Sequence, residues 1–291
     1  MKKILFRGCG TAIATPFTNE NKINYEVLKK YLDFQMENKV DAIIVCGTTG
    51  ESATLSNNEK KELINFTVKY VNKKVPVIAG TGSNNTKFAI ELSRYAEKVG
   101  ADGLLVVTPY YNKTTQEGLI EHYTEIARKV KIPIIMYNVP SRTGVNILPE
   151  TCLELSKIEN IVAIKEASGN ISQIAKIAQL CKDNLYIYSG NDDQILPILS
   201  IGGIGVISVL SNIKPKEVHD ICEKYINGNI DNAKEIFLKF LPLANSLFCE
   251  VNPIPIKYAL SKIGYDFGKP RLPLVELKNK ELIDSQIKML W

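Results

Sequence analysis

The sequence predicts an α/β protein, specifically a closed (β/α)8 barrel of the TIM type followed by a C-terminal helical appendage. Eight short β-rich runs recur along the chain, and stretches with helical character separate them. The runs are apolar throughout rather than alternating, which is typical of strands buried on both faces of a parallel sheet. Eight strand-then-helix units fit a closed barrel better than a doubly wound sheet, which usually has five or six strands. The predicted strands are residues 10–17, 42–47, 75–80, 103–109, 132–138, 161–167, 185–190 and 203–211.

The stretches between the runs carry helix signals. After the second run, Ser56 and Glu59 form the Ser-x-x-Glu pattern of a capping box, and apolar residues at helical spacing follow. Beyond the eighth run the strand pattern stops, and the apolar spacing over residues 233–248 is that of a helix. We therefore expect a barrel with the active site over residues 1–214 and a helical extension over residues 215–291.

The composition is that of an ordinary globular protein. Of 291 residues, 45% are hydrophobic and 23% are charged, which argues against a disordered or fibrous chain. The formal net charge is +5 without a block of like charges, so we expect no nucleic-acid partner. No run of about 18 apolar residues occurs, so we expect no membrane span. The N-terminus has too few apolar residues before Arg7 for a signal peptide, which favours a cytoplasmic protein.

Metal and cofactor motifs are weak in this sequence. Six cysteines form no Cys-x-x-Cys pair, and the two histidines, His122 and His219, fall in helical, polar stretches. A zinc site and a Ser-His-Asp triad are therefore poorly supported. Asp192 and Asp193 could bind magnesium, but a helix N-cap role is the better interpretation. The glycine-rich pieces "AGTGSN" and "SIGGIG" lack the dinucleotide-binding pattern, so we expect neither a metal nor a cofactor.

A lysine and a glutamate interrupt the sixth apolar run. Because side chains alternate along a strand, Lys165 and Glu166 face opposite ways and cannot pair. The alternation places Val162, Ile164 and Glu166 on one face, and Ile161, Ala163, Lys165 and Ala167 on the other. If the second face lines the barrel interior, its alanines leave room around the lysine amine. Glu166 then faces the helices and needs a partner that the sequence does not identify.

Lys165 is a candidate Schiff-base nucleophile, because chemistry in such barrels lies at the carboxyl ends of the strands. An amine removed from water is more readily neutral, and a neutral amine attacks carbonyls. A structural lysine that extends to solvent is the alternative. Tyr137 ends the preceding strand, where its phenol could transfer protons or simply pack. Thr48 and Thr49 precede a helix, at a turn whose backbone N–H groups and hydroxyls could bind a carboxylate. The alternative is a simple ST-turn, in which the threonine hydroxyls bond to the nearby backbone. Together these residues suit a 2-oxo acid.

Five motifs in order along the chain resemble the dihydrodipicolinate synthases, within the superfamily of N-acetylneuraminate lyases and class I pyruvate aldolases. The motifs are "GTTGES" at 47–52, "TPYYNK" at 108–113, "YNVPSRTG" at 137–144, "IVAIKEASG" at 161–169 and "YSGND" at 188–192. The resemblance implies a barrel that condenses pyruvate with L-aspartate 4-semialdehyde to give 4-hydroxy-tetrahydrodipicolinate, the first committed step toward diaminopimelate and lysine. It implies a covalent imine with pyruvate and no cofactor.

The resemblance also implies catalytic roles for single residues. Lys165 matches the family's Schiff-base lysine, and Tyr137 matches the phenol that exchanges protons with the bound keto acid. Thr48 and Tyr111 match the other members of the proton relay, and Tyr111 acts in the site of a neighbouring subunit in family members. The family commonly forms a homotetramer built from two tight dimers, so the resemblance implies a homo-oligomer.

Substrate-binding roles follow from the same resemblance. Thr49 matches the residue that helps hold the pyruvate carboxylate, and Gly190 and Ile207 match residues that line that pocket. Arg142 matches the residue that binds the semialdehyde carboxylate, which a guanidinium can do bidentately. N-acetylneuraminate lyases usually have an apolar residue at that position. The alternatives are another pyruvate-dependent aldolase, such as an N-acetylneuraminate lyase or a 2-keto-3-deoxy sugar acid aldolase, and a non-catalytic barrel that binds keto acids.

One departure from the family concerns feedback inhibition by lysine. The lysine-sensitive pattern favours histidine near positions 57 and 60 and glutamate at 88, whereas this sequence has Asn57, Lys60 and Phe88. Lys60 would repel the ammonium of a lysine ligand, and Phe88 offers it no charge. We therefore expect weak or absent inhibition by lysine.

Overall fold

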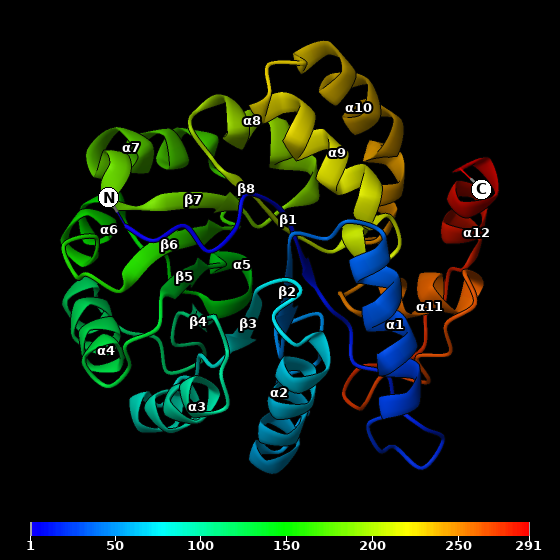
Figure 1. Ribbon diagram of the computed structural model, residues 1–291, viewed down its shortest axis with the longest axis horizontal. Coiled ribbons are helices and arrows are strands. Elements are labelled where there is room, and N and C mark those ends of the chain that lie inside the picture. The colour runs from blue at the N-terminus through cyan, green and yellow to red at the C-terminus, as the bar shows by residue number, and fades with distance from the viewer. Residues whose placement is uncertain (1, 291) are drawn as a thin grey trace.

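Eight parallel strands close into a barrel in which each strand pairs with its neighbours in sequence and β8 pairs with β1 (Figure 1). The computed structural model describes residues 2–290. All eight predicted strands are present, so the predicted fold class is confirmed. The strands are β1 (Gly8–Ala12), β2 (Ala42–Val45), β3 (Val77–Gly80), β4 (Gly103–Val107), β5 (Ile134–Asn138), β6 (Ile161–Glu166), β7 (Tyr186–Ser189) and β8 (Gly205–Ser208).

Helices surround the barrel and alternate with its strands (Figure 1). The predicted capping box starts α2: the Ser56 hydroxyl accepts from the Glu59 N–H at 3.2 Å, and the Glu59 carboxylate accepts from the Ser56 N–H at 2.8 Å. The α-helices are α1 (Tyr25–Glu37), α2 (Asn57–Val71), α3 (Thr86–Lys98), α4 (Gln116–Arg128), α5 (Pro140–Thr143), α6 (Pro149–Leu155), α7 (Ile171–Cys181), α8 (Ile195–Ser200), α9 (Pro215–Ile226), α10 (Ile230–Ser246), α11 (Ile254–Lys262) and α12 (Glu281–Leu290). Three short 3₁₀ turns are η1 (Lys182–Asn184), η2 (Asp192–Gln194) and η3 (Leu210–Asn212).

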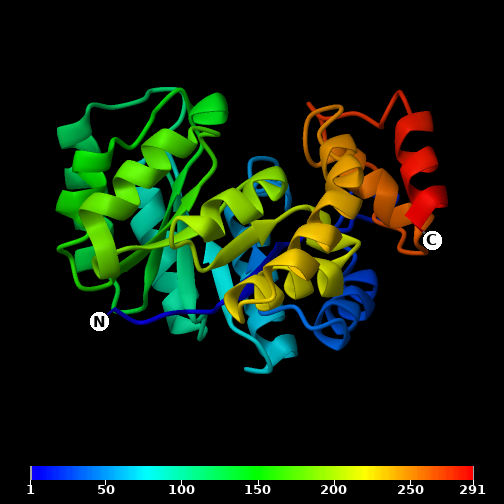
Figure 2. The ribbon, with the colours of Figure 1, turned by 90° about the horizontal axis from the view of Figure 1, so that it is seen from above.

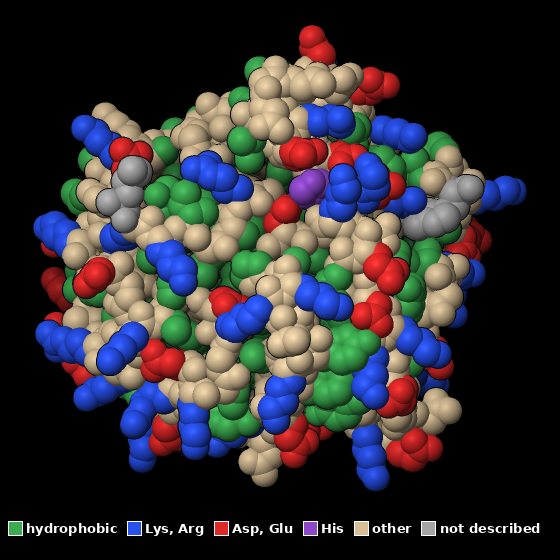
Figure 3. Space-filling model, viewed as in Figure 1, with side chains coloured by type: hydrophobic (Ala, Val, Ile, Leu, Met, Phe, Trp, Pro, Cys, Tyr) green, Lys and Arg blue, Asp and Glu red, His purple; other side chains and the backbone are tan. Residues whose placement is uncertain are grey.

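The C-terminal helices gather on one side of the barrel, as Figure 2 shows. Helix α9 packs against β1 and β8, α10 packs on α9, and α12 packs on α10 and α11. The division at residue 214 stays a prediction, and α9 begins directly after it. Between residues 2 and 290, no helix combines the length and apolar character that crossing a membrane requires. On the face viewed in Figure 3, basic and acidic side chains are interspersed rather than gathered by sign.

Apolar side chains form one core inside the barrel and another between the strands and the helices. Inside the barrel, Phe6 precedes β1 and stacks on Tyr188 with ring centroids 4.4 Å apart. The Tyr188 hydroxyl donates to the Phe6 carbonyl at 2.7 Å. This pair fills part of the interior, so the barrel is a packed core rather than a pore.

The prediction of which β6 side chains face the interior is wrong at the start of the strand. Ile134 of β5 pairs with Ile161, but Ile135 pairs with Ala163, so Val162 is an extra residue at a β-bulge. As a result Ile161 packs in the outer core and Val162 packs inside the barrel, the reverse of the prediction. From Ala163 onward the alternation follows the predicted pattern.

Candidate active site

Lys165 and Tyr137 meet inside the barrel at the carboxyl ends of β5 and β6. The two residues are paired across the strands, and both are buried, with 6% and 7% of their surfaces exposed. The Lys165 amine lies over the Tyr137 ring, 4.3 Å from its centroid. Ala163 and Ala167 belong to the same interior core, as predicted, and they leave space around the lysine. The arrangement brings a primary amine and a phenol together in a largely dry setting.

Gly190 and Ile207 bound this interior space. A Cβ atom at Gly190 would lie 2.6 Å from the Ala167 Cβ and 3.1 Å from the Lys165 Cε, so only glycine fits without displacing the lysine stem. Ile207 is fully buried in the same interior core, on β8. Gly190 therefore lies directly against the Lys165 stem, and the role of both residues as pocket walls stays a prediction.

Thr48 and Thr49 lie in a tight turn after β2. The Gly50 N–H donates to the Gly47 carbonyl at 3.1 Å, and the Glu51 N–H donates to the Thr48 carbonyl at 3.0 Å. Thr48 faces the cavities described below, whereas Thr49 is buried. The turn thus presents one threonine to the open space and holds the other inside the protein.

A buried ion pair, which the sequence did not reveal, ties this turn to the C-terminal helices. The Lys257 amine lies 2.7 Å from the Glu51 carboxylate, and the two side chains are 2% and 0% exposed. The second oxygen of Glu51 accepts from the Arg271 N–H at 2.9 Å. Burial lowers the pKa of Lys257, and the Glu51 charge opposes that shift. The Lys257 amine also lies 4.2 Å from the centre of the Phe17 ring.

Two adjoining cavities open at the carboxyl ends of the strands. The outer one, of about 270 Å³, is lined by Arg142, Thr48, Lys60 and Asn252 among others. The inner one, of about 40 Å³, shares Thr48 and Lys60 and reaches Tyr137. Arg142 thus lies in the outer of the two cavities, and the inner cavity is not lined by it.

Asn252 is a site residue that sequence reasoning missed. Its amide donates to the Thr49 hydroxyl at 3.0 Å, and its backbone carbonyl accepts from the Arg142 guanidinium at 3.4 Å. It stands in "VNPIPI", residues 251–256, within the stretch that was predicted only as a helical extension. A polar residue before proline in an apolar stretch was the one available signal.

Tyr111 is a predicted site residue that lies outside the lining of both cavities. Its side chain is 92% exposed, and its backbone adopts a positive φ of 71°, which is uncommon for a residue with a bulky side chain. Its neighbour Tyr110 lines the outer cavity instead. Tyr111 therefore projects into solvent from the rim.

Asp192 is buried close to the lysine. Its carboxylate accepts from the Ser208 hydroxyl and from the N–H groups of Val209 and Leu210, the latter two both at 2.9 Å. Neither Asp192 nor Asp193 caps its own short turn; instead Asp192 satisfies N–H groups at the start of η3. Burial raises the pKa of Asp192, and its hydrogen bonds and the Lys165 charge oppose that shift.

The two histidines lie away from the strand ends, on helices. His122 is buried rather than in polar surroundings: its Nδ1 lies 2.9 Å from the Thr86 hydroxyl, and burial lowers its pKa to about 4. His219 Nδ1 lies 2.7 Å from the Asp41 carboxylate, a bond that raises the pKa of His219. Neither histidine can act on a substrate held near Lys165.

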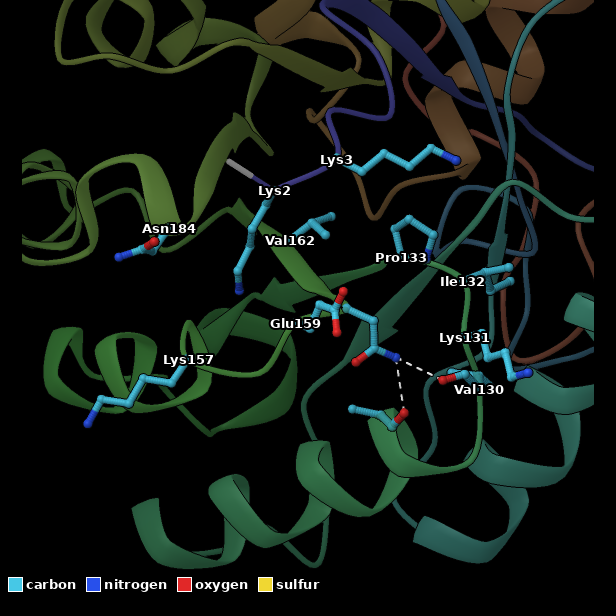
Figure 4. Close-up of a pocket in the computed structure, with 12 residues that line it drawn as sticks. Lys2, Lys3, Val130, Lys131, Ile132, Pro133, Lys157, Glu159, Val162 and Asn184 are labelled. Carbon is cyan, nitrogen blue, oxygen red and sulfur yellow. Dashed lines mark hydrogen bonds between the residues drawn. The ribbon is translucent and has the colours of Figure 1, made fainter.

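The largest cavity lies at the opposite, amino-terminal end of the barrel and has a volume of about 970 Å³. It contains several lysines, but Figure 4 shows the Lys157 amine extending to one side of the view and the amines of Lys3 and Lys131 extending to the other. The Lys2 amine donates to the backbone carbonyls of Ile158 and Ile161. These amines do not converge on a common point. The smaller cavities, of which the inner one reaches Tyr137 under the Lys165 amine, are the better candidate for the active site.

Comparison with known proteins agrees with this geometry. A sequence profile of the Dihydrodipicolinate synthetase family matches residues 5–288. The chain is 60% identical to a 4-hydroxy-tetrahydrodipicolinate synthase of Caldicellulosiruptor saccharolyticus, covering 97% of this chain and 96% of the relative. It is 58% identical to 4-hydroxy-tetrahydrodipicolinate synthase 1 of Clostridium acetobutylicum, covering 96% and 94%. The crystal structure of the Thermotoga maritima dihydrodipicolinate synthase superposes with a TM-score of 0.96 at 45% identity, covering 98% and 99%. The chain therefore belongs to the dihydrodipicolinate synthetase family.

Proposed function

We propose that this enzyme condenses pyruvate with L-aspartate 4-semialdehyde through a Schiff base on Lys165, giving 4-hydroxy-tetrahydrodipicolinate without a cofactor. The observation that carries the proposal is the buried amine of Lys165, held over the Tyr137 ring at the carboxyl end of the barrel. The activity printed for relatives that are about 60% identical supports the choice of substrates. The pathway is that of diaminopimelate and lysine biosynthesis.

The first half of the reaction activates pyruvate. The neutral amine of Lys165 attacks the ketone carbon, and the resulting carbinolamine loses its hydroxyl as water to give an iminium ion. Tyr137 is placed to supply and remove the protons of these steps, with Thr48 and the Tyr111 of a second subunit completing the relay. The turn at Thr49 holds the pyruvate carboxylate.

The second half joins the two substrates. Loss of a methyl proton from the iminium ion gives an enamine, whose carbon attacks the aldehyde of a semialdehyde bound through its carboxylate to Arg142. The amino group of the bound semialdehyde then attacks the imine carbon. Cyclisation expels the amine of Lys165 and regenerates the enzyme.

Replacing Arg142 with alanine is expected to raise the KM for the semialdehyde by about 10- to 100-fold, because one charge-assisted contact is lost. Trapping of pyruvate by borohydride should stay unchanged, since Arg142 lines only the outer cavity. Steady-state kinetics with each substrate varied in turn measure the difference. An equal loss with sugar aldehydes as co-substrate would favour another pyruvate aldolase, and absence of any turnover in the wild type would favour a keto-acid sensor.

We expect lysine to inhibit the enzyme weakly or not at all. Lys60 lines both cavities, as Thr48 does. Burial lowers the pKa of the Lys60 amine. An amine carries no negative charge, so Lys60 cannot pair with the ammonium group of a lysine ligand. Phe88 stands partly exposed in the first turn of α3, where it offers no carboxylate. A coupled assay with lysine up to the millimolar range measures the inhibition constant, and strong inhibition by submillimolar lysine would contradict the prediction.

The active enzyme is proposed to be a homo-oligomer, as a tetramer of two tight dimers. Tyr111 supports this, because a relay member that projects into solvent needs a second subunit to receive it. One structural neighbour is described as a monomeric dihydrodipicolinate synthase variant, so oligomeric state can vary within this fold. Sedimentation velocity is expected to show a species larger than a monomer; a purely monomeric protein with full activity would remove the role of Tyr111. A cytoplasmic location likewise stays a proposal from the sequence.

A further inference from the structure

A fully buried carboxylate lies directly behind the proposed nucleophile. Glu166 follows Lys165 on β6, faces the helical layer and has no exposed surface. Its two oxygens each accept from the Asn138 amide nitrogen at 3.1 Å, and one of them also accepts from the Ser168 N–H at 2.8 Å. No ion pair involves Glu166 within residues 2–290. Burying a carboxylate without a cation costs free energy, and the hydrogen bonds from Asn138 and Ser168 offset part of that cost.

The side-chain amide of Asn138 bonds to the far end of the segment 138–147, which carries Arg142. Its oxygen accepts from the Ile147 N–H at 3.0 Å, and its nitrogen donates to the Asn146 side chain at 2.9 Å. One side chain at the end of β5 therefore holds the far end of the segment 138–147. That segment contains α5 and hence Arg142.

Helix α7 joins the same network. The Asn146 amide donates to the Gln173 side chain at 2.7 Å, and Gln173 donates back to Asn146 at 3.1 Å. We call the four side chains of Glu166, Asn138, Asn146 and Gln173 the clasp. Within the clasp, Asn146 and Glu166 both accept from the Asn138 nitrogen, but the Glu166 carboxylate has no N–H of its own, so it requires the nitrogen of Asn138 rather than the oxygen to face it.

The clasp links the two halves of the proposed site. Asn138 and Glu166 are paired across β5 and β6, next to the Tyr137 and Lys165 pair on the opposite face. The strand ladder itself holds the latter pair, whereas the segment after Asn138 leaves the sheet. On its other side, the Arg142 guanidinium donates one long hydrogen bond, of 3.4 Å, to the Asn252 backbone carbonyl. The side chain of Gln116, on α4, also donates to the Asn146 carbonyl at the end of this segment, at 2.9 Å.

We propose that Glu166 is a positioning residue that acts through Asn138 to set the place of Arg142 relative to Lys165. Because Glu166 lies on the outer face of β6, it reaches neither the substrates nor the amine. Its effect should therefore fall on the semialdehyde rather than on pyruvate. This inference rests on the proposed function, in which Arg142 receives the semialdehyde carboxylate.

Glu166→Gln tests the inference with almost no change in volume. The Asn138 nitrogen contacts both carboxylate oxygens of Glu166. In either orientation, the glutamine side chain therefore places its NH₂ donor next to the NH₂ donor of Asn138. We expect the KM for the semialdehyde to rise about tenfold, with the KM for pyruvate and the rate of borohydride trapping within about twofold of wild type. Kinetics with each substrate varied, and mass spectrometry after trapping, provide the two readouts.

A double variant, Glu166→Gln with Asn138→Asp, supplies a rescue. Donor and acceptor exchange places in it, because the introduced glutamine amide can donate to the introduced carboxylate, and the Asn146 amide can rotate to donate to that carboxylate as well. Recovery of at least about threefold in the semialdehyde KM over Glu166→Gln supports the clasp.

Tyr123→Phe is the matched control. It removes another buried hydrogen bond of the same layer, 2.9 Å to the Val106 carbonyl, without touching the clasp. This control should leave the ratio of the two KM values unchanged.

Three results would overturn the inference: an equal rise in both KM values, a lower unfolding midpoint with an unchanged KM ratio, or a double variant no better than Glu166→Gln. Failure of the proposed function looks different. In that case the wild-type protein itself would gain no mass with pyruvate and borohydride, and no variant would need to be compared.

Discussion

Replacing Lys165 with alanine is expected to reduce condensation by at least about 1,000-fold, because the covalent route through the imine is lost. The buried position of the amine makes replacement by a solvent nucleophile ineffective, since Lys165 and Tyr137 are both largely closed to water. Incubation of wild-type protein with pyruvate and borohydride should add the mass of a reduced pyruvate adduct at Lys165. Tandem mass spectrometry of the digested protein identifies the modified residue.

Lys165→Arg is the control for charge in this experiment. It keeps a cation near Tyr137 but cannot form an imine under these conditions, so it should be as inactive as Lys165→Ala and should not be labelled. If either variant kept more than about a tenth of the wild-type rate, or if borohydride labelled another lysine, the Schiff-base assignment would fail. A far-ultraviolet circular dichroism spectrum like that of the wild type shows that the variants are folded.

Most of the fold was predictable because buried parallel strands have a strong sequence pattern. Seven of the eight apolar runs contain a whole strand, and the first run overlaps β1, which begins at Gly8 and ends at Ala12, earlier than predicted. The bulge at Val162 was not predictable, because an extra residue in one strand depends on the pairing with its neighbour. The side of β6 that carries Lys165 was still predicted correctly, since the bulge precedes Ala163.

The candidate site was predictable where it follows strand ends and not where it depends on distant contacts. Lys165 and Tyr137 each close an apolar run, so their meeting at one end of the barrel follows from parallel strands. The partner of Glu166 was not identified, although Asn138 occupies the matching place on the neighbouring strand. The partner of Glu51 lies 206 residues away, on a helix whose packing the sequence pattern does not specify.

Replacing Glu51 with glutamine is expected to lower the free energy of unfolding by about 3 kcal/mol, because it leaves the Lys257 charge buried without its counter-ion. Both side chains are almost fully inaccessible to water, so solvent cannot take over the role of the carboxylate. Urea unfolding at neutral pH measures the change. Glu59→Gln is the matched control: Glu59 pairs with Arg271 at 2.6 Å but is partly exposed, and glutamine preserves the capping box, so its cost should be smaller than that of Glu51→Gln.

The double variant of Glu51→Gln with Lys257→Met tests whether the two residues contribute to the free energy of unfolding as a pair or independently. Lys257→Met alone leaves the Glu51 carboxylate buried with the Arg271 N–H as its remaining donor, so it should also destabilise the protein. Removing both charges should recover at least half of the summed loss, because a buried pair is costly mainly when one partner is left alone. If the two losses simply add, or if Glu51→Gln costs no more than Glu59→Gln, the pair does not stabilise the fold. Because Glu51 follows the turn of Thr48 and Thr49, a measured coupling would mean that the C-terminal helices hold the pyruvate side of the site in place, a role that a barrel alone does not provide.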